Sequence, residues 1–261
     1  MREAYENLPP LERLKAIMAR LRAPDGCQWD RAQTYKSLLP YLIEEVYEVV
    51  EAIEDNDKER LREELGDLLI QIFFHSQIAD EEGLFDIDKV ADGINEKLIR
   101  RHPHVFLEKK DLAPDQVRDQ WEKIKVESHE KDSVLSGVPK TMPALNLAFR
   151  VGEKAAGVGF DWKDARDIFD KIKEEQAEFE HEFNRLDKEK MSDELGDLIF
   201  AMVNLARKVG IDPEAALRST VRRFINRFGY IEERLKKAQK QFSETSLDEM
   251  EVLWQESKNK V

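Results

Sequence analysis

The sequence has a single cysteine, few glycines and prolines, and no long apolar run. One cysteine, Cys27, among 261 residues excludes an internal disulfide and is typical of proteins from a reducing compartment. No apolar stretch reaches the roughly 20 residues of a membrane-spanning helix. The first residues also lack the apolar core of a secretion signal. These absences predict a soluble, cytoplasmic protein without a membrane partner.

Basic residues are fewer than acidic residues in this chain. The chain has 42 Lys and Arg against 55 Asp and Glu, which gives a formal net charge of -13. Proteins that coat nucleic acids usually show a net basic face, so direct nucleic-acid binding is not expected. A nucleotide ligand remains compatible with this balance, because a phosphate group needs only a local cluster of cations.

Nucleotide-binding loops of the common kinds are missing as well. The sequence contains no GxxxxGK[ST] motif. Gly157-Val158-Gly159 lacks the preceding strand and the third glycine of a dinucleotide-binding loop, so a turn is the better interpretation. Alternating β-type patterns are nearly absent, whereas apolar residues recur at helical spacing, which predicts an all-α fold.

The helical pattern stops once in the middle of the chain and then restarts. Residues 128–143 contain Gly137, Pro139 and Pro143 and show little periodicity, so they are predicted to be a linker. It separates two predicted helical-bundle domains that arose by duplication, 1–127 and 144–261. Helices are expected at about 40–55, 58–81, 87–101, 115–126, 145–156, 165–186, 192–209, 213–241 and 247–258.

The duplication is clearest in five acidic residues that occur twice in the same order. Each member of the second set follows its counterpart by 130 positions, and both sets read EExxE, a gap, then ExxD. The first set is Glu44, Glu45, Glu48, Glu64 and Asp67, and the second is Glu174, Glu175, Glu178, Glu194 and Asp197. Acidic residues on an ordinary solvated face need not keep one spacing, so the repeat favours a site that requires all five.

Helical geometry predicts that the members of each set meet. Successive residues advance by about 100° on a helix, so the EExxE glutamates share one side, beside an apolar stripe. Glu64 and Asp67 share a face of the next helix, which is apolar on almost every side, and are therefore expected to line an interior wall. Carboxylates this close require a cation, and all-oxygen ligands favour Mg²⁺, Mn²⁺ or Ca²⁺ over zinc. A di-iron site needs two Glu-x-x-His pairs, and only Glu178 and His181 form one.

A second recurring cluster follows each acidic set. In both copies two basic residues lie four apart, and further on a tryptophan precedes a lysine by four. The residues are Lys97, Arg101, Trp121 and Lys125 in the first copy and Arg223, Arg227, Trp254 and Lys258 in the second. Salt bridges within a helix and core packing explain each pair taken singly. Their recurrence favours phosphate binding by the cations and base stacking by the tryptophans.

Shorter motifs connect the sequence with a known family. They cover nearly the whole chain and comprise Cys27-Gln28-Trp29-Asp30, Gln33-Thr34, Pro40-Tyr41, the EExxE and EELGDLL segments, 100–106 (RRHPHVF) and 158–162 (VGFDW). With these motifs the chain resembles the MazG family of nucleoside triphosphate pyrophosphohydrolases, in the all-α NTP pyrophosphatase superfamily. The resemblance implies two tandem domains that dimerise. It further implies magnesium-dependent hydrolysis of NTPs and dNTPs to nucleoside monophosphate and pyrophosphate, with Mn²⁺ as an alternative metal.

Carried over by motif position, the resemblance also implies residue roles. The metal ligands would be Glu175, Glu178, Glu194 and Asp197, with first-copy counterparts Glu45, Glu48, Glu64 and Asp67. Catalysis, by orienting or deprotonating the attacking water, would fall to Glu174 and Glu44 beside Glu175 and Glu45. Nucleotide contacts would come from Lys171, Glu174, Lys190, Asp193, Arg223, Arg227, Trp254 and Lys258, and from Lys97, Arg101, Trp121 and Lys125 in the first copy.

Two other functions remain open from the sequence. A phosphoribosyl-ATP or dUTP hydrolase would use the same chemistry on a narrower substrate. A regulatory module that binds an alarmone nucleotide or a toxin–antitoxin partner would use the same cluster without turnover. Both acidic registers are intact, and the second is the one we expect to be catalytic.

Overall fold

Helices form all the regular structure that is described. The structure is a computed structural model that describes residues 3–107, 109–113, 116–117, 120, 133–258 and 260. No strand occurs among these residues, which confirms the predicted all-α class. Within the same ranges, no helix combines the length and apolar character that crossing a bilayer requires.

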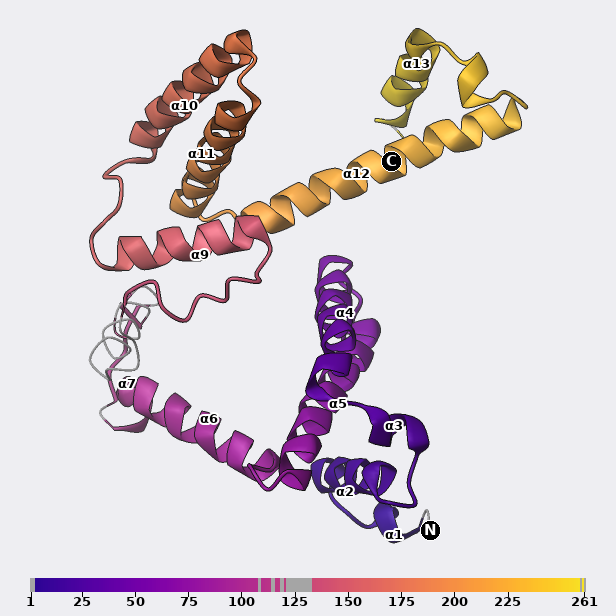
Figure 1. Ribbon diagram of the computed structural model, residues 1–261, viewed down its shortest axis with the longest axis vertical. Helices are drawn as coiled ribbons and strands as arrows, with labels where there is room; N and C mark the ends of the chain where they lie inside the picture. Colours follow the sequence, from indigo (N-terminus) through magenta and orange to yellow (C-terminus); the bar gives the residue numbers. More distant parts are fainter. Residues whose placement is uncertain are drawn as a thin grey trace. The chain divides into compact units, whose positions relative to one another are not determined.

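The chain divides into two compact units, residues 1–113 and 114–261 (Figure 1). Residues 121–132 lie outside the described part of the chain, so the predicted bounds 1–127, 128–143 and 144–261 stay a prediction. Part of the predicted linker is attached to the second unit. The buried Lys154 donates hydrogen bonds to the backbone oxygens of Val134 and Ser136, at 3.1 and 3.2 Å.

The first unit is built around a long antiparallel helix pair, α4 and α5. Its described helices are α1 (Glu3–Glu6), α2 (Pro10–Arg22), α3 (Gln28–Ala32), α4 (Tyr35–Glu54), α5 (Lys58–Glu81), α6 (Ile87–Arg101) and α7 (Pro103–Phe106). Helix α2 packs on α5. The core where they meet contains Met18, Leu38, Phe74 and Ile78, all buried. This core holds α4 and α5 together over the part of the hairpin away from its turn.

The second unit repeats the helix pair with α10 and α11. Its described elements are α9 (Ala144–Gly157), α10 (Ala165–Arg185), α11 (Lys188–Lys208), α12 (Pro213–Lys237), a short 3-10 turn η1 (Phe242–Glu244) and α13 (Leu247–Ser257). Helix α9 packs against α11 and α12, and α13 packs against α12. Figure 1 shows α12 leading away from the α10–α11 pair with α13 beside its far half.

Both hairpins turn through the same backbone geometry. Asn56 has a φ of 56° and Leu186, 130 positions later, a φ of 57°. The next residue, Asp57 or Asp187, caps the following helix by accepting hydrogen bonds from its first backbone N–H groups. The left-handed conformation costs most residues about 1–2 kcal/mol but is adopted more readily by Asn, so the local penalty is larger at Leu186 than at Asn56. Because the turns match, EExxE lies opposite ExxD in both units.

Several predicted helix bounds are wrong. Helix α4 begins at Tyr35 rather than about Pro40, because Thr34 and Ser37 form a capping box in which each side chain accepts from the other's backbone N–H. Helix α11 begins at Lys188 rather than Ser192, and α12 ends at Lys237 rather than about Gln241. Helices α1, α2, α3 and α7 were not predicted. The helix expected at 115–126 falls mainly on residues outside those described.

Candidate active site

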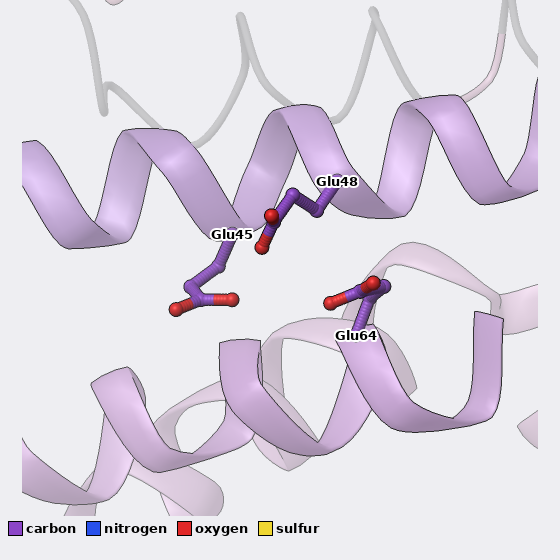
Figure 2. Close-up of side chains that lie close together, drawn as sticks. All are labelled: Glu45, Glu48 and Glu64. Carbon is purple, nitrogen blue, oxygen red and sulfur yellow. The ribbon is translucent and has the colours of Figure 1, made fainter. Parts of the chain in front are cut away.

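The first acidic register forms a cluster between α4 and α5. Glu45 and Glu48 project from α4 toward Glu64 on α5 (Figure 2). One carboxylate oxygen from each of the three lies within 4.8 Å of the other two, and all three side chains are half-buried. Two members of the register, Glu44 and Asp67, are exposed and do not join this group.

The second register is more complete. Glu174, Glu175 and Glu178 form one group with oxygens within 4.8 Å of one another, and Glu175 forms a second group with Glu194 and Asp197. Glu175 is common to both groups and is 5% exposed. All five members of this register therefore lie in the α10–α11 clusters.

The expected interior wall on α5 is only half correct. Glu64 has a side-chain exposure of 14%, but Asp67 is exposed. The prediction inferred burial from a helix that is apolar on almost every side, whereas Leu65 is 49% and Ile72 42% exposed. An apolar side chain does not by itself show that its face is covered.

The clustered carboxyl groups repel one another. Desolvation raises the pKa of Glu45 above its usual value, and the other acidic side chains of its register raise it further. The pKa of Glu194 is raised for the same two reasons, desolvation first. Because folding raises these pKa values, the metal-free clusters cost stability at neutral pH, and protonation relieves this cost as the pH falls through the raised values. A bound cation at pH 7 would relieve the same repulsion.

Each unit also places one of its own basic side chains on its cluster, but at different positions. In the first unit Arg60 donates to Glu64 at 3.1 Å and to Glu51 at 2.9 Å. In the second unit the Lys171 ammonium lies 2.8 Å from Glu174 and 2.6 Å from Glu175, and these contacts raise the pKa of Lys171. The first unit has Tyr41 where the second has Lys171.

The basic and aromatic residues of the second unit form a separate group on α12 and α13. The Arg227 guanidinium lies 5.8 Å from the centre of the Trp254 ring, within the range of a cation–π contact. Phe224 packs on the same ring with centroids 5.2 Å apart. Arg223 donates to the hydroxyl groups of Ser219 and Thr220 on its own helix. Arg227 and Trp254, which were both predicted to contact the nucleotide, therefore contact each other across α12 and α13.

The same group lies apart from the acidic cluster of its own chain. Helix α13 packs on α12, not on the α10–α11 pair that carries the five carboxylates (Figure 1). Lys190, Asp193 and Lys258 are exposed, while Lys97 and Arg101 of the first unit are half-buried. Trp121 and Lys125 lie outside the described residues.

Two charged residues beside the clusters were missed from the sequence. Arg60 precedes Glu64 by four, a spacing that predicts a contact on one helix face. Glu182 follows Glu178 by four and is 9% exposed. Comparison of the two copies would have drawn attention to it, because the position 130 residues earlier is Ala52.

Comparisons with known proteins agree with this architecture. The model of the MazG nucleotide pyrophosphohydrolase domain matches residues 33–106 and 164–230, which contain α4–α5 and α10–α11. The chain is 44% identical over 249 residues to the nucleoside triphosphate pyrophosphohydrolase/pyrophosphatase MazG of Thermotoga maritima, covering 95% of each chain. It is 41% identical over 254 residues to the nucleoside triphosphate pyrophosphohydrolase of Escherichia coli K12, covering 95% of this chain and 97% of that protein.

Both acidic hairpins lie inside the matched segments, and the similarity to these relatives extends over nearly the full length. The chain belongs to the MazG nucleotide pyrophosphohydrolase family.

Proposed function

We propose that this protein hydrolyses nucleoside triphosphates, both NTPs and dNTPs, to nucleoside monophosphate and pyrophosphate in a cation-dependent reaction. The observation that carries the proposal is the second-unit cluster, in which five carboxylates form two groups around Glu175. The names of the two full-length relatives support the same reaction. Location in the cytoplasm and the absence of a nucleic-acid partner remain predictions from cysteine content and charge.

The donor set of the cluster fits a hard divalent cation. Only carboxylate oxygens are present, which suits Mg²⁺ or Mn²⁺. When bound, such an ion lowers the pKa of a water molecule and neutralises phosphate charge. The residues that would hold it are Glu175, Glu178, Glu194 and Asp197. Their counterparts Glu45, Glu48, Glu64 and Asp67 would do so in the first unit.

Glu174 is the proposed base. Its side chain is 56% exposed and is held by Lys171 at 2.8 Å, beside Glu175. From this position it would orient the attacking water and accept its proton as the water attacks the α-phosphorus. Pyrophosphate leaves from the opposite side of the phosphorus. Glu44 occupies the matching position in the first unit.

Basic side chains would balance the negative charge of the substrate. Lys171 and Lys190 lie on the two helices of the hairpin, and Lys190 is exposed. Arg223 and Arg227 supply guanidinium groups for phosphate oxygens. Trp254 offers a ring for base stacking, which distinguishes bases less than a hydrogen-bonding pocket does, so we expect a broad base range.

Activity is expected to require added Mg²⁺ and to extend over mixed NTPs and dNTPs. Full-length protein stripped with chelator should release no pyrophosphate, and Mg²⁺ should restore release with nucleoside monophosphate in equal amount. The assay is a substrate panel with both products quantified by chromatography. Hydrolysis of dUTP alone or of phosphoribosyl-ATP alone would contradict the proposed broad substrate range. Release of orthophosphate in place of pyrophosphate would contradict attack at the α-phosphorus.

A second copy of the chain is the proposed partner. The helices of the second unit leave large apolar side chains uncovered, including Ile199 at 42%, Met202 at 50%, Phe224 at 55% and Ile225 at 62% exposure. Apolar surface of this extent commonly marks a protein–protein contact. A homodimer would cover it and would give the α12–α13 group a route to the acidic cluster of another chain.

The molar mass in solution is expected to be twice the 30.5 kDa of one chain. Ile225→Asp should shift the protein toward the monomer, because a dimer would bury the new carboxylate in an apolar contact. Light scattering coupled to size-exclusion chromatography measures both. Leu186→Asp, at a hairpin turn that is 79% exposed, is the control and should leave the mass unchanged. A monomeric parent protein would contradict the proposal.

The first unit supports a second candidate role. Only three of the five acidic residues cluster there, whereas all five cluster in the second unit. This arrangement favours a nucleotide-binding regulatory module without turnover in the first unit, beside a catalytic second unit.

A further inference from the structure

Glu182 is a buried carboxylate that the proposed reaction does not use. It lies on α10 one turn after Glu178 and two turns after Glu175, on the same helix face. The residue is 9% exposed, and its Oε2 atom is buried without a hydrogen-bond partner among the described residues. The basic side chains beside it, Arg185 with its Nε at 3.6 Å and His181 with its Nε2 at 3.7 Å, are largely exposed.

At the positions equivalent to Glu182 and its basic neighbours, the first unit has a neutral residue flanked by acidic ones. Ala52 occupies the position of Glu182 and is fully buried. Two acidic residues of the first unit, Glu51 and Asp55, stand where the second has His181 and Arg185. They surround Arg60, at 2.9 Å and 3.9 Å respectively.

The two units compensate different carboxylates of their clusters. In the first unit Arg60 bonds to Glu64. In the second unit Lys171 pairs with Glu174 and Glu175, whereas Lys190, at the Arg60 position, is exposed and forms no ion pair with Glu194 among the described contacts. Glu182 instead adds a further negative charge that repels Glu194.

A buried and poorly compensated carboxylate costs stability. The matching helix of the first unit forms with the buried Ala52 at the equivalent position, so this kind of hairpin does not need a polar group there. A positive charge bound nearby would offset this loss of stability. Its attraction to the Glu182 carboxylate acts through a partly desolvated region, where electrostatic interactions are stronger than in water. Glu182 belongs to neither of the two oxygen groups around Glu175, so it lies outside the direct ligand sets.

We propose that Glu182 is a positioning residue that strengthens divalent-cation binding at Glu175, Glu194 and Asp197 without being one of the ligands. This inference rests on the proposed function, because it requires a cation at that cluster. It also assigns the stronger cation site to the second unit. Residues that support metal ligands from outside typically change metal affinity by about 10–100-fold when replaced.

The test is Mn²⁺ binding to the full chain in the absence of nucleotide. Glu182→Gln keeps the shape and removes the charge, and is expected to raise the Mn²⁺ dissociation constant of the tighter site about tenfold. Isothermal titration, with free Mn²⁺ followed by electron paramagnetic resonance, measures it. The Mg²⁺ concentration for half-maximal pyrophosphate release should rise by a similar factor, with the rate at saturating Mg²⁺ little changed.

Three variants separate charge from structure. Glu182→Asp keeps the charge and should retain most of the affinity, whereas Glu182→Ala restores the first-unit residue and should lose it. Glu180→Gln is the matched control, because Glu180 is an exposed residue of the same helix with a hydrogen bond from Gln176, and it should bind Mn²⁺ like the parent. Circular dichroism shows that each variant is folded.

Two results would overturn the inference, and they differ from failure of the proposed function. An unchanged Mn²⁺ affinity in Glu182→Gln, with or without a change in melting temperature, would leave Glu182 a structural residue only. An equal loss in Glu180→Gln would show a general charge effect. A parent chain that binds no Mn²⁺ would remove the cation site itself, and with it both proposals.

Discussion

Replacing Glu175 with glutamine is expected to lower the rate of pyrophosphate release by about 10²-fold or more, because several kcal/mol of transition-state stabilisation by a bound cation depend on its ligands. Glu175 is the most buried member of its register and belongs to both oxygen groups of the α10–α11 cluster. Glutamine keeps the size of the side chain but removes its charge. The substitution therefore weakens both groups at once.

The matched variant lies 130 residues earlier. Glu45→Gln is expected to retain most of the activity, because the first-unit cluster contains three of its five acidic residues and Arg60 already bonds to Glu64. Initial rates at saturating Mg²⁺ and NTP measure the difference, and circular dichroism confirms folding. Equal losses in the two variants would show two working sites. Full activity in both single variants and in the double variant would contradict the proposed mechanism.

The acidic clusters were predictable because their geometry is local. Spacing within EExxE and ExxD fixes which side chains share a helix face, and a short turn brings the two faces together. The repeated register of five was enough to predict the groups that contain Glu175 and Glu45. Helix starts were less predictable where the signal was a capping pair, as at Thr34, instead of a change in apolar pattern.

The compensating contacts were predictable in part, and the distant ones were not. Arg60 and Lys171 bind carboxylates three or four residues further along their own helices, a spacing that allows these contacts. The partner of Trp254 depends on how α13 docks on α12, which no local spacing determines. The exposure of Asp67 depends on which apolar face of α5 is covered by another helix. The last two depend on the tertiary arrangement.

The loop before α10 is held by an ion-pair network whose loss should destabilise the second unit. Asp161 accepts hydrogen bonds from the Arg207 guanidinium and, at 2.9 Å, from Lys208, which also donates to the backbone oxygen of Trp162. The Arg207 side chain is 9% exposed. Asp161→Asn leaves this guanidinium buried without its counter-charge, so we expect a loss of about 2–4 kcal/mol in the free energy of unfolding.

Asp170→Asn is the matched control for this substitution. Asp170 pairs with Lys173 at 3.0 Å, but their side chains are 80% and 74% exposed, so the expected change is within about 0.5 kcal/mol. Urea unfolding followed by circular dichroism at pH 7 measures both variants. Equal stability losses in the two would contradict the importance of the buried network.

The same network predicts a pH dependence with a definite sign. Desolvation alone would raise the pKa of Asp161, but hydrogen bonds from Arg207 and Lys208 outweigh it and lower the pKa below its usual value. A lowered carboxyl pKa contributes stability that is complete above the unfolded-state pKa of about 3.9 and is lost as the pH falls through the folded-state value. The stability difference between parent and Asp161→Asn should therefore be constant from pH 7 to about pH 5 and shrink below about pH 4. A difference that stays unchanged at the lowest pH where both remain folded would show that the carboxylate charge is not what stabilises the loop.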